Sequence, residues 1–226
     1  MLVLACGSVD DLTQNLSEAS QWLSADERLR CDQLGMHRLR EFLASRWLLR
    51  QVLIGQGLVG SEERVAISIG GAPKLIGYSH IHLSISHRAG WVVAAVSDGP
   101  VGMDVELVKS RDVAAMADQI CTEREKKHLD SLPVPAAMQK LHQIWALKEA
   151  AYKSGLSQCD PMDFYRIGVV PDELGRCHAM SWLWSDGRVM ACVAANFEGC
   201  DFQAMWPGAY VQRWLLEKAE NENTRH

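Results

Sequence analysis

The sequence lacks any apolar run that approaches the roughly 18–20 residues needed to cross a bilayer. Residues 1–7 end in Ala-Cys-Gly, like a lipoprotein cleavage site. They lack the basic segment and the apolar core of about 7–15 residues that a signal peptide carries. We therefore expect no membrane partner, and a first β-strand at residues 2–9.

Basic charge is also scarce, since 23 Lys and Arg residues face 28 Asp and Glu residues, for a formal net charge of −5. A nucleic-acid-binding protein is expected to carry a basic excess, so we expect no nucleic acid partner. The seven cysteines are an odd number and include no C-x-x-C pair. This pattern favours reduced thiols in a cytoplasmic protein over a disulfide framework or a zinc site.

Helix and strand patterns alternate along the 226 residues, which are enough to bury a real core. Ser24 and Glu27 form a capping-box pattern that opens two helices broken near Gly35. A strand is expected at residues 81–85, leading to the dipeptide Ser86-His87.

Two carboxylates stand on one predicted strand, Val101–Glu106, which a turn separates from the apolar strand at residues 91–96. Successive side chains in a strand point to opposite faces, so Asp104 and Glu106 share a face. Neighbouring carboxylates repel each other unless a cation lies between them, and Mg²⁺ prefers such oxygen ligands. Taken alone, the pattern is also typical of a solvated strand face.

A helix is predicted at residues 141–153, after a break at Pro133-Val134-Pro135, because the segment holds good helix formers and no Gly or Pro. At a spacing of four residues, Trp145, Glu149 and Lys153 form one stripe along it. An ordinary amphipathic surface helix has the same pattern.

Taken together, the two segments are specific. The motif G-x-D-x-E at residues 102–106, followed by W-x-x-K-E-A-x-x-K at residues 145–153, resembles the signature of the Sfp-type 4′-phosphopantetheinyl transferases. A third family element, Ser-His before the apolar strand, is present as Ser86-His87. The resemblance extends loosely over about residues 20–200.

The resemblance implies an α/β (α+β) fold, a pseudo-dimer of two similar α/β subdomains with the active site at their interface. The subdomains would span residues 1–106 and 107–210, followed by a polar tail at 211–226. A faint repeat agrees with this, because Gly187–Val193 echoes Gly90–Val96.

The resemblance also implies a reaction: the Mg²⁺-dependent transfer of 4′-phosphopantetheine from coenzyme A to a serine of an apo acyl or peptidyl carrier protein, releasing 3′,5′-ADP. Asp104, Glu106 and Glu149 would hold the Mg²⁺. Glu149 would also be the general base, and Lys153 would neutralise or protonate the leaving phosphate. We expect a cytoplasmic monomer, and the sequence leaves open whether Lys148 serves packing or chemistry.

Coenzyme A contacts follow from the same resemblance. His87 would contact the phosphates with Ser86 nearby, and Arg30 and Arg46 are candidate phosphate ligands. Family members often carry Gly-Lys-Pro where this chain has Gly71-Ala72-Pro73, so Lys74 is a candidate displaced by two positions.

Two alternatives use the same residues. An Mg²⁺-dependent coenzyme A pyrophosphohydrolase would direct the same carboxylates at water instead of a carrier serine. A coenzyme A-binding relative without transfer activity would retain the pocket alone. The intact set of Asp104, Glu106, Glu149 and Lys153 argues against this second alternative.

Overall fold

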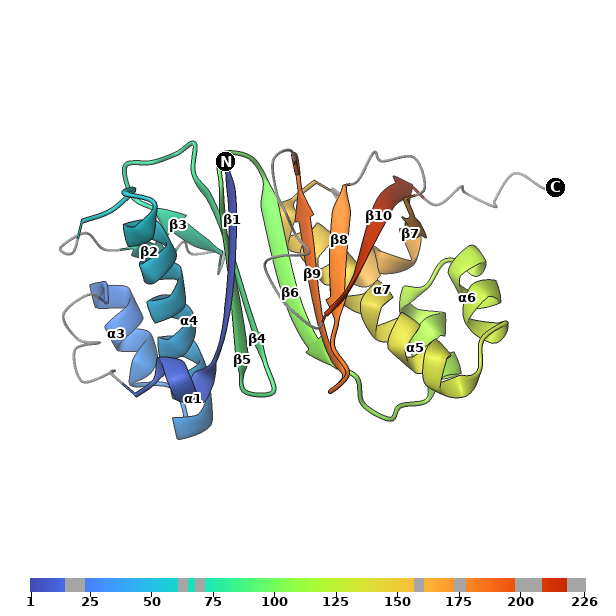
Figure 1. Cartoon of the computed structure of the whole chain (residues 1–226). Coiled ribbons are helices and arrows are strands. Elements are labelled where there is room, and N and C mark those ends of the chain that lie inside the picture. The colour runs from blue at the N-terminus through green and yellow to red at the C-terminus, as the bar shows by residue number, and fades with distance from the viewer. Residues whose placement is uncertain are drawn as a thin grey trace.

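The computed structural model describes residues 1–14, 23–60, 65–67, 72–156, 161–172, 178–197 and 209–218. In these ranges two main β-sheets stand side by side, and a long helix packs against each (Figure 1). The predicted mixed α/β chain of two subdomains is confirmed. No helix in the described ranges is long and apolar enough to cross a membrane.

The N-terminal half is built on a three-stranded antiparallel sheet of order β1-β5-β4. Its strands are β1 (Leu2–Ser8), β4 (His82–Arg88) and β5 (Trp91–Ser97), and α4 (Met36–Gly55) packs against them. The smaller elements of this half are α1 (Val9–Leu12), α3 (Ala25–Cys31) and the paired strands β2 (Val65–Ile67) and β3 (Pro73–Leu75).

Local sequence signals set the helix boundaries of this half. Ser24 and Glu27 form the predicted capping box at the start of α3. Gly35 is the N-cap of α4, so the predicted break between the two helices is confirmed.

The middle strand β5 is buried on both faces, which explains its continuous apolar run. Val92 and Val96 pack on the α4 side, in the core that contains Leu49. Val93 and Ala95 face the other way and pack against the second sheet. A strand enclosed in this way has no face for polar residues.

The C-terminal half is a five-stranded antiparallel sheet of order β6-β9-β8-β10-β7. Its strands are β6 (Val101–Leu107), β7 (Ile167–Pro171), β8 (Ala179–Leu183), β9 (Arg188–Ala194) and β10 (Tyr210–Lys218). The helices are α5 (Val113–Ile120), α6 (Glu123–Asp130), α7 (Val134–Ser154) and the 3₁₀ segment η2 (Pro161–Arg166).

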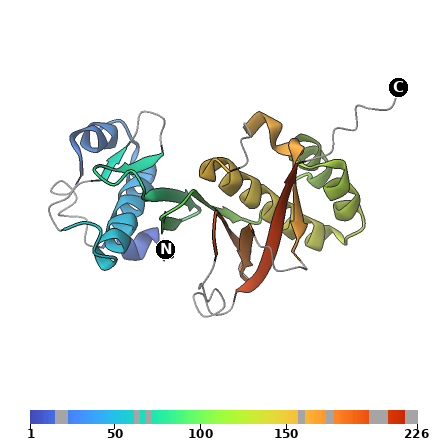
Figure 2. The same cartoon turned by 90° about the horizontal axis from the view of Figure 1, so that it is seen from above.

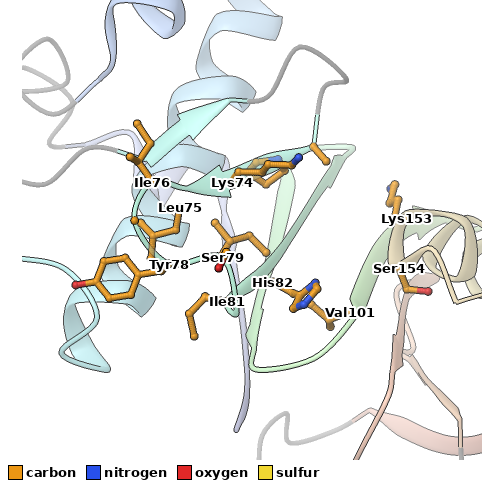
Figure 3. Close-up of a pocket in the computed structure, with 14 residues that line it drawn as sticks. Lys74, Leu75, Ile76, Tyr78, Ser79, Ile81, His82, Val101, Lys153 and Ser154 are labelled. Carbon is orange, nitrogen blue, oxygen red and sulfur yellow. The ribbon is translucent and has the colours of Figure 1, made fainter.

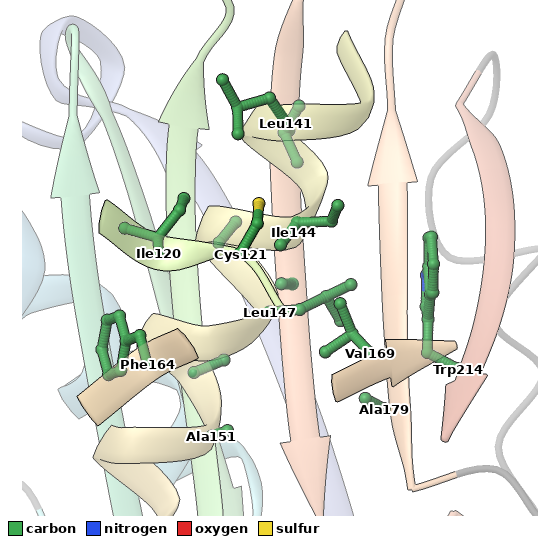
Figure 4. Packing of buried hydrophobic residues seen from close by; sticks show 14 of the residues in the cluster. Ile120, Cys121, Leu141, Ile144, Leu147, Ala151, Phe164, Val169, Ala179 and Trp214 are labelled. Carbon is green, nitrogen blue, oxygen red and sulfur yellow. The ribbon is translucent and has the colours of Figure 1, made fainter. Parts of the chain in front are cut away.

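Helix α7 covers one face of this sheet. Leu141, Ile144 and Leu147 lie at helical spacing and pack with Val169 of β7 and Trp214 of β10 (Figure 4). The opposite face of the sheet packs on the N-terminal half. These two contacts fix α7, β6 and the first sheet relative to one another (Figure 2).

The two halves also share a hydrogen bond between strands. The backbone nitrogen of Met103 in β6 donates to Ser84 Oγ of β4 at 2.8 Å. The predicted subdomain boundary at residue 106 falls within β6, whose backbone pairs with β9 of the second sheet.

Matching glycine turns precede the two apolar strands in which the repeat was found. Gly90, between β4 and β5, has φ of +80°, and Gly187, between β8 and β9, has φ of +85°. Residues with a Cβ atom rarely adopt this left-handed region, so each hairpin favours glycine at its turn.

Three local expectations differ from the structure. Ser86 and His87 lie within β4, because the strand pairs with β5 as far as Arg88. Pro133 is the N-cap of α7 and Pro135 stands in its first turn, where no backbone N–H is needed. The expected polar tail from residue 211 is instead strand β10 as far as Lys218, since Trp214 and Leu215 are buried in the sheet.

Candidate functional site

Gly102, the glycine of the G-x-D-x-E motif, lets β6 lie directly against α7. A Cβ atom at this position would lie 1.9 Å from the backbone oxygen of Ala150 and 2.6 Å from the backbone nitrogen of Ser154. Both are backbone atoms of a packed helix, so neither can give way cheaply. The glycine therefore sets how closely the carboxylates of β6 approach the helix.

The stripe of α7 meets the carboxylates of β6 directly. Lys153 Nζ donates to Asp104 Oδ1 at 2.6 Å, and Trp145 Nε1 donates to Glu106 Oε1 at 3.3 Å. Strand and helix therefore run in opposite directions along each other. Glu149 lies one helical turn from each of the two α7 residues.

Asp104 lies at the centre of this arrangement, and only 4% of its surface is exposed. Its Oδ1 atom also accepts a hydrogen bond from Ser86 Oγ at 2.8 Å, and Lys153 Nζ donates to the same Ser86 oxygen at 3.1 Å. Its Oδ2 atom is buried without a hydrogen-bond partner among the described residues. A buried carboxylate oxygen in this state is costly unless a cation or a donor reaches it.

Glu106 is held from two sides. Besides the Trp145 contact, its Oε2 lies 3.4 Å from Arg88 Nε of β4. A residue of the first sheet thus pairs with a carboxylate of the second.

Glu149 lies in an environment that disfavours its charge. Burial raises the pKa of its carboxyl group above the ordinary value, and the negative charges of Asp104 and Glu106 raise it further. The Lys153 ammonium opposes this rise in pKa. The charges of Asp104 and Glu106 therefore oppose ionisation of Glu149, as neighbouring carboxylates do.

The predicted ligands suit a hard cation in the type of their donor atoms, without forming a preassembled site among the described residues. All three predicted ligands offer carboxylate oxygens, and one buried oxygen of Asp104 has no partner in the described ranges. Within those ranges no three His, Cys, Asp or Glu side chains form a ready metal-binding group. Lys153 supplies the positive charge at Asp104, while Arg88 and Trp145 contact Glu106.

The predicted histidine is close to this centre. His87 lies on β4 next to Ser86, and burial lowers its pKa, which the Lys153 charge lowers further. Its Nδ1 atom lies 3.3 Å from Glu41 Oε2 of α4.

The two predicted arginines differ in their surroundings. Arg46 is buried and forms a 2.8 Å ion pair with Glu27, and its guanidinium lies 4.9 Å from the ring centre of Phe42. Arg30 is exposed, and its guanidinium lies 5.7 Å from the same ring centre. Arg46, which was predicted to contact a phosphate of coenzyme A, therefore already has an ionic partner inside the protein.

Lys74 is exposed and lines a pocket of about 780 Å³. Lys153 and Ser154 of α7 line the other side of this pocket (Figure 3). Its described lining contains two lysines and no carboxylate, so it is suited to an anion. Lys74, the predicted nucleotide contact, therefore borders the same pocket as Lys153, which bonds to Asp104.

Two charged residues here were missed by the sequence reasoning, Arg88 and Glu41, and so was the ion pair that Lys148 forms. Lys148 Nζ donates to Glu125 Oε2 and to the Ile120 carbonyl oxygen, each at 2.6 Å. Lys148 therefore serves packing. No local pattern marks such pairs, because their partners lie on other elements.

Comparison with known proteins gives a consistent picture. Residues 100–193 match the profile of the 4′-phosphopantetheinyl transferase superfamily. The Bacillus pumilus protein named 4′-phosphopantetheinyl transferase psf-1 is 35% identical over 83 residues, which cover 37% of this chain and 35% of that protein. The Bacillus subtilis (strain 168) protein named 4′-phosphopantetheinyl transferase Sfp is 25% identical over 162 residues, covering 66% of this chain and 71% of that protein.

The matched region spans about a third of the length of the first two relatives, 35% for the B. pumilus protein and 31% for the Aneurinibacillus migulanus protein named 4′-phosphopantetheinyl transferase gsp. Among solved structures, the Helicobacter pylori holo-[acyl-carrier-protein] synthase in complex with coenzyme A is 20% identical, with a TM-score of 0.32. The matched region covers 42% of this chain and 97% of the Helicobacter pylori chain.

Proposed function

We propose that the chain is a member of the 4′-phosphopantetheinyl transferase superfamily, whose profile residues 100–193 match, and that it transfers 4′-phosphopantetheine from coenzyme A to a serine of an apo acyl or peptidyl carrier protein. The observation that carries the proposal is the contact between the two motifs. Lys153 of the helix motif and Asp104 of the strand motif are joined at 2.6 Å.

The reaction replaces one phosphorus–oxygen bond by another. The serine oxygen attacks the phosphorus that bears pantetheine, the bond to the bridging pyrophosphate oxygen breaks, and 3′,5′-ADP leaves. The serine proton passes to a base. A carboxyl group with a raised pKa suits this role, and Glu149 has one.

Magnesium is part of the proposal. Asp104, Glu106 and Glu149 would hold it, and the ion would neutralise charge that develops on the pyrophosphate oxygens. The buried, unpartnered Asp104 Oδ2 atom supports this choice among the described residues. Lys153 places a second positive charge between this centre and the anion-suited pocket, where it can neutralise the leaving phosphate.

The coenzyme A site extends from this centre into the 780 Å³ pocket, whose volume is within the range of about 300–1,000 Å³ that is usual for small-molecule sites. Lys74 would meet the nucleotide, and His87 and Ser86 would lie at the phosphates. Arg30 and Arg46 remain candidates for phosphate contacts. The Arg46 ion pair with Glu27 implies that Arg46 would share its charge between Glu27 and the ligand.

We place the site between subdomains 1–106 and 107–210 of a cytoplasmic monomer. Contacts between β6 and α7 support this placement, since Lys153 and Trp145 of α7 bond to carboxylates of β6.

An intact-mass assay tests the proposal. The protein, coenzyme A and Mg²⁺ are mixed with an apo carrier protein, and the carrier mass is measured with and without EDTA. The account predicts that one phosphopantetheine adds to the carrier and that EDTA blocks the addition. Cleavage of coenzyme A without carrier modification would indicate the hydrolase, and coenzyme A binding without any cleavage would indicate the binding relative.

A further inference from the structure

Glu41 of α4 is a charged side chain in an unusual position, because only 8% of its surface is exposed. Acidic residues are rarely buried unless they are paired. The Oε2 atom of Glu41 lies 3.3 Å from Nδ1 of His87 and 3.5 Å from Nδ1 of His37. One buried carboxylate oxygen thus faces two imidazole rings.

The two histidines differ in their surroundings. The His37 side chain lies on the same helix as Glu41 and is 80% exposed. The His87 side chain is 43% exposed and lies on β4, next to the serine that bonds to Asp104. A carboxylate that accepts a hydrogen bond from Nδ1–H fixes the ring and stabilises the imidazolium, in which Nε2 also carries a proton that can be donated to an anion.

We propose that Glu41 is a positioning residue: it accepts a hydrogen bond from Nδ1–H of His87 and so holds the ring in the orientation and the imidazolium form in which Nε2–H donates to the pyrophosphate of coenzyme A. The inference rests on the proposed function, because it deepens the same site. Glu41 reaches the ligand through His87 and does not touch it.

The charges around His87 support this role. Burial lowers the pKa of His87, and the positive charges of Lys153 on α7 and Arg46 on α4 lower it further. The Glu41 carboxylate opposes them and raises that pKa. Without the Glu41 charge, the imidazolium that binds an anion best would form only at lower pH.

The test is a double-mutant cycle on coenzyme A binding, measured by titration calorimetry from pH 5.5 to about 8. Its variants are Glu41→Gln, His87→Ala and the double variant, with His37→Ala as the matched control on the other partner of Glu41. Glu41→Gln is expected to weaken binding about tenfold near neutral pH, as loss of a charge-assisted hydrogen bond does. It should have no further effect once His87 is alanine, and His37→Ala should leave the affinity unchanged.

A spectroscopic measurement separates positioning from folding. The His87 ring resonances, followed by NMR across the same pH range, should titrate at lower pH in Glu41→Gln than in the wild type. An equal loss of affinity in the wild-type and His87→Ala backgrounds would overturn the inference, as would an unchanged His87 titration. If the wild-type protein binds coenzyme A and leaves every carrier unmodified, the proposed transfer fails and the Glu41–His87 coupling still stands or falls by this cycle.

Discussion

Lys148 and Glu149 are neighbours in the chain, yet their side chains lie on different sides of α7. Lys148 is fully buried, and its ammonium bonds to Glu125 at 2.6 Å. Glu149 is half-buried and feels the charges of Asp104 and Glu106. A helix turns about 100° per residue, so adjacent positions can face different environments. The first residue holds the fold, and the second belongs to the candidate site.

The variant Lys148→Met should therefore lose stability. It leaves the Glu125 carboxylate buried without its positive partner, which costs about 3–5 kcal/mol of unfolding free energy. Urea unfolding measures the loss. The double variant Lys148→Met, Glu125→Gln removes the stranded charge and should recover part of it. An equal loss in both variants would show that the charge pair is not the cause.

A second prediction concerns the close approach of β6 and α7. Gly102→Ala would place a Cβ atom 1.9 Å from the Ala150 carbonyl oxygen, so strand and helix must separate. We expect a loss of about 3 kcal/mol, as in overpacked cores. Gly168→Ala is the matched control, because its Cβ would meet no atom closer than 3.7 Å. Similar unfolding midpoints for the two variants would contradict the close approach.

Lys153 should matter for stability as well as for transfer. In Lys153→Met, Asp104 keeps its burial and loses the ammonium, which costs about 1–3 kcal/mol without added metal. Because a cation at Asp104 can replace the lost charge, Mg²⁺ should stabilise this variant more than the wild type. Thermal unfolding with and without Mg²⁺ tests this, with exposed Lys127→Met as the control. An equal rise in unfolding temperature on addition of Mg²⁺ in all three proteins would show that the cation does not replace the Lys153 charge at Asp104.

Glu149 gives a prediction about pH. Its pKa is raised in the folded protein, so its contribution to stability is full below the unfolded pKa of about 4.3 and is lost as pH rises through the folded pKa. At neutral pH, without added divalent ions, Glu149→Gln should therefore unfold at a higher temperature than the wild type. The difference should vanish toward pH 4.

The control for this experiment is Glu123→Gln, on an exposed residue at the start of α6. It should not reproduce the rise in unfolding temperature. A lower unfolding temperature for Glu149→Gln at neutral pH would mean that the surroundings stabilise the ionised carboxylate, which contradicts a raised pKa for Glu149.

Much of this fold could be predicted from local patterns. The capping box at Ser24 and Glu27 and the period of α7 depend on residues a few positions apart. The alternation in β6 also placed Asp104 and Glu106 on one face, which Lys153 and Trp145 contact. Each of these signals depends on residues that are close together in the chain, so a single sequence contains them.

The contacts between elements could not be predicted in the same way. Glu41 meets His87 across 46 positions of the chain, and Arg88 meets Glu106 only because β4 lies beside β6. Strand β10 was missed because its polar residues at 212, 213 and 217 conceal the buried Trp214 and Leu215. These positions are set by tertiary packing, which a single sequence does not display.

The most direct test of the central claim compares the wild type with Asp104→Asn in the intact-mass assay with coenzyme A, Mg²⁺ and an apo carrier protein. Asparagine keeps the shape of the side chain and removes the charge at the centre of the site. Asp112→Asn is the matched control, because this residue caps α5 and can do so as asparagine. The account predicts phosphopantetheine on the carrier with the wild type and with Asp112→Asn, and none with Asp104→Asn. Full modification by Asp104→Asn would contradict it.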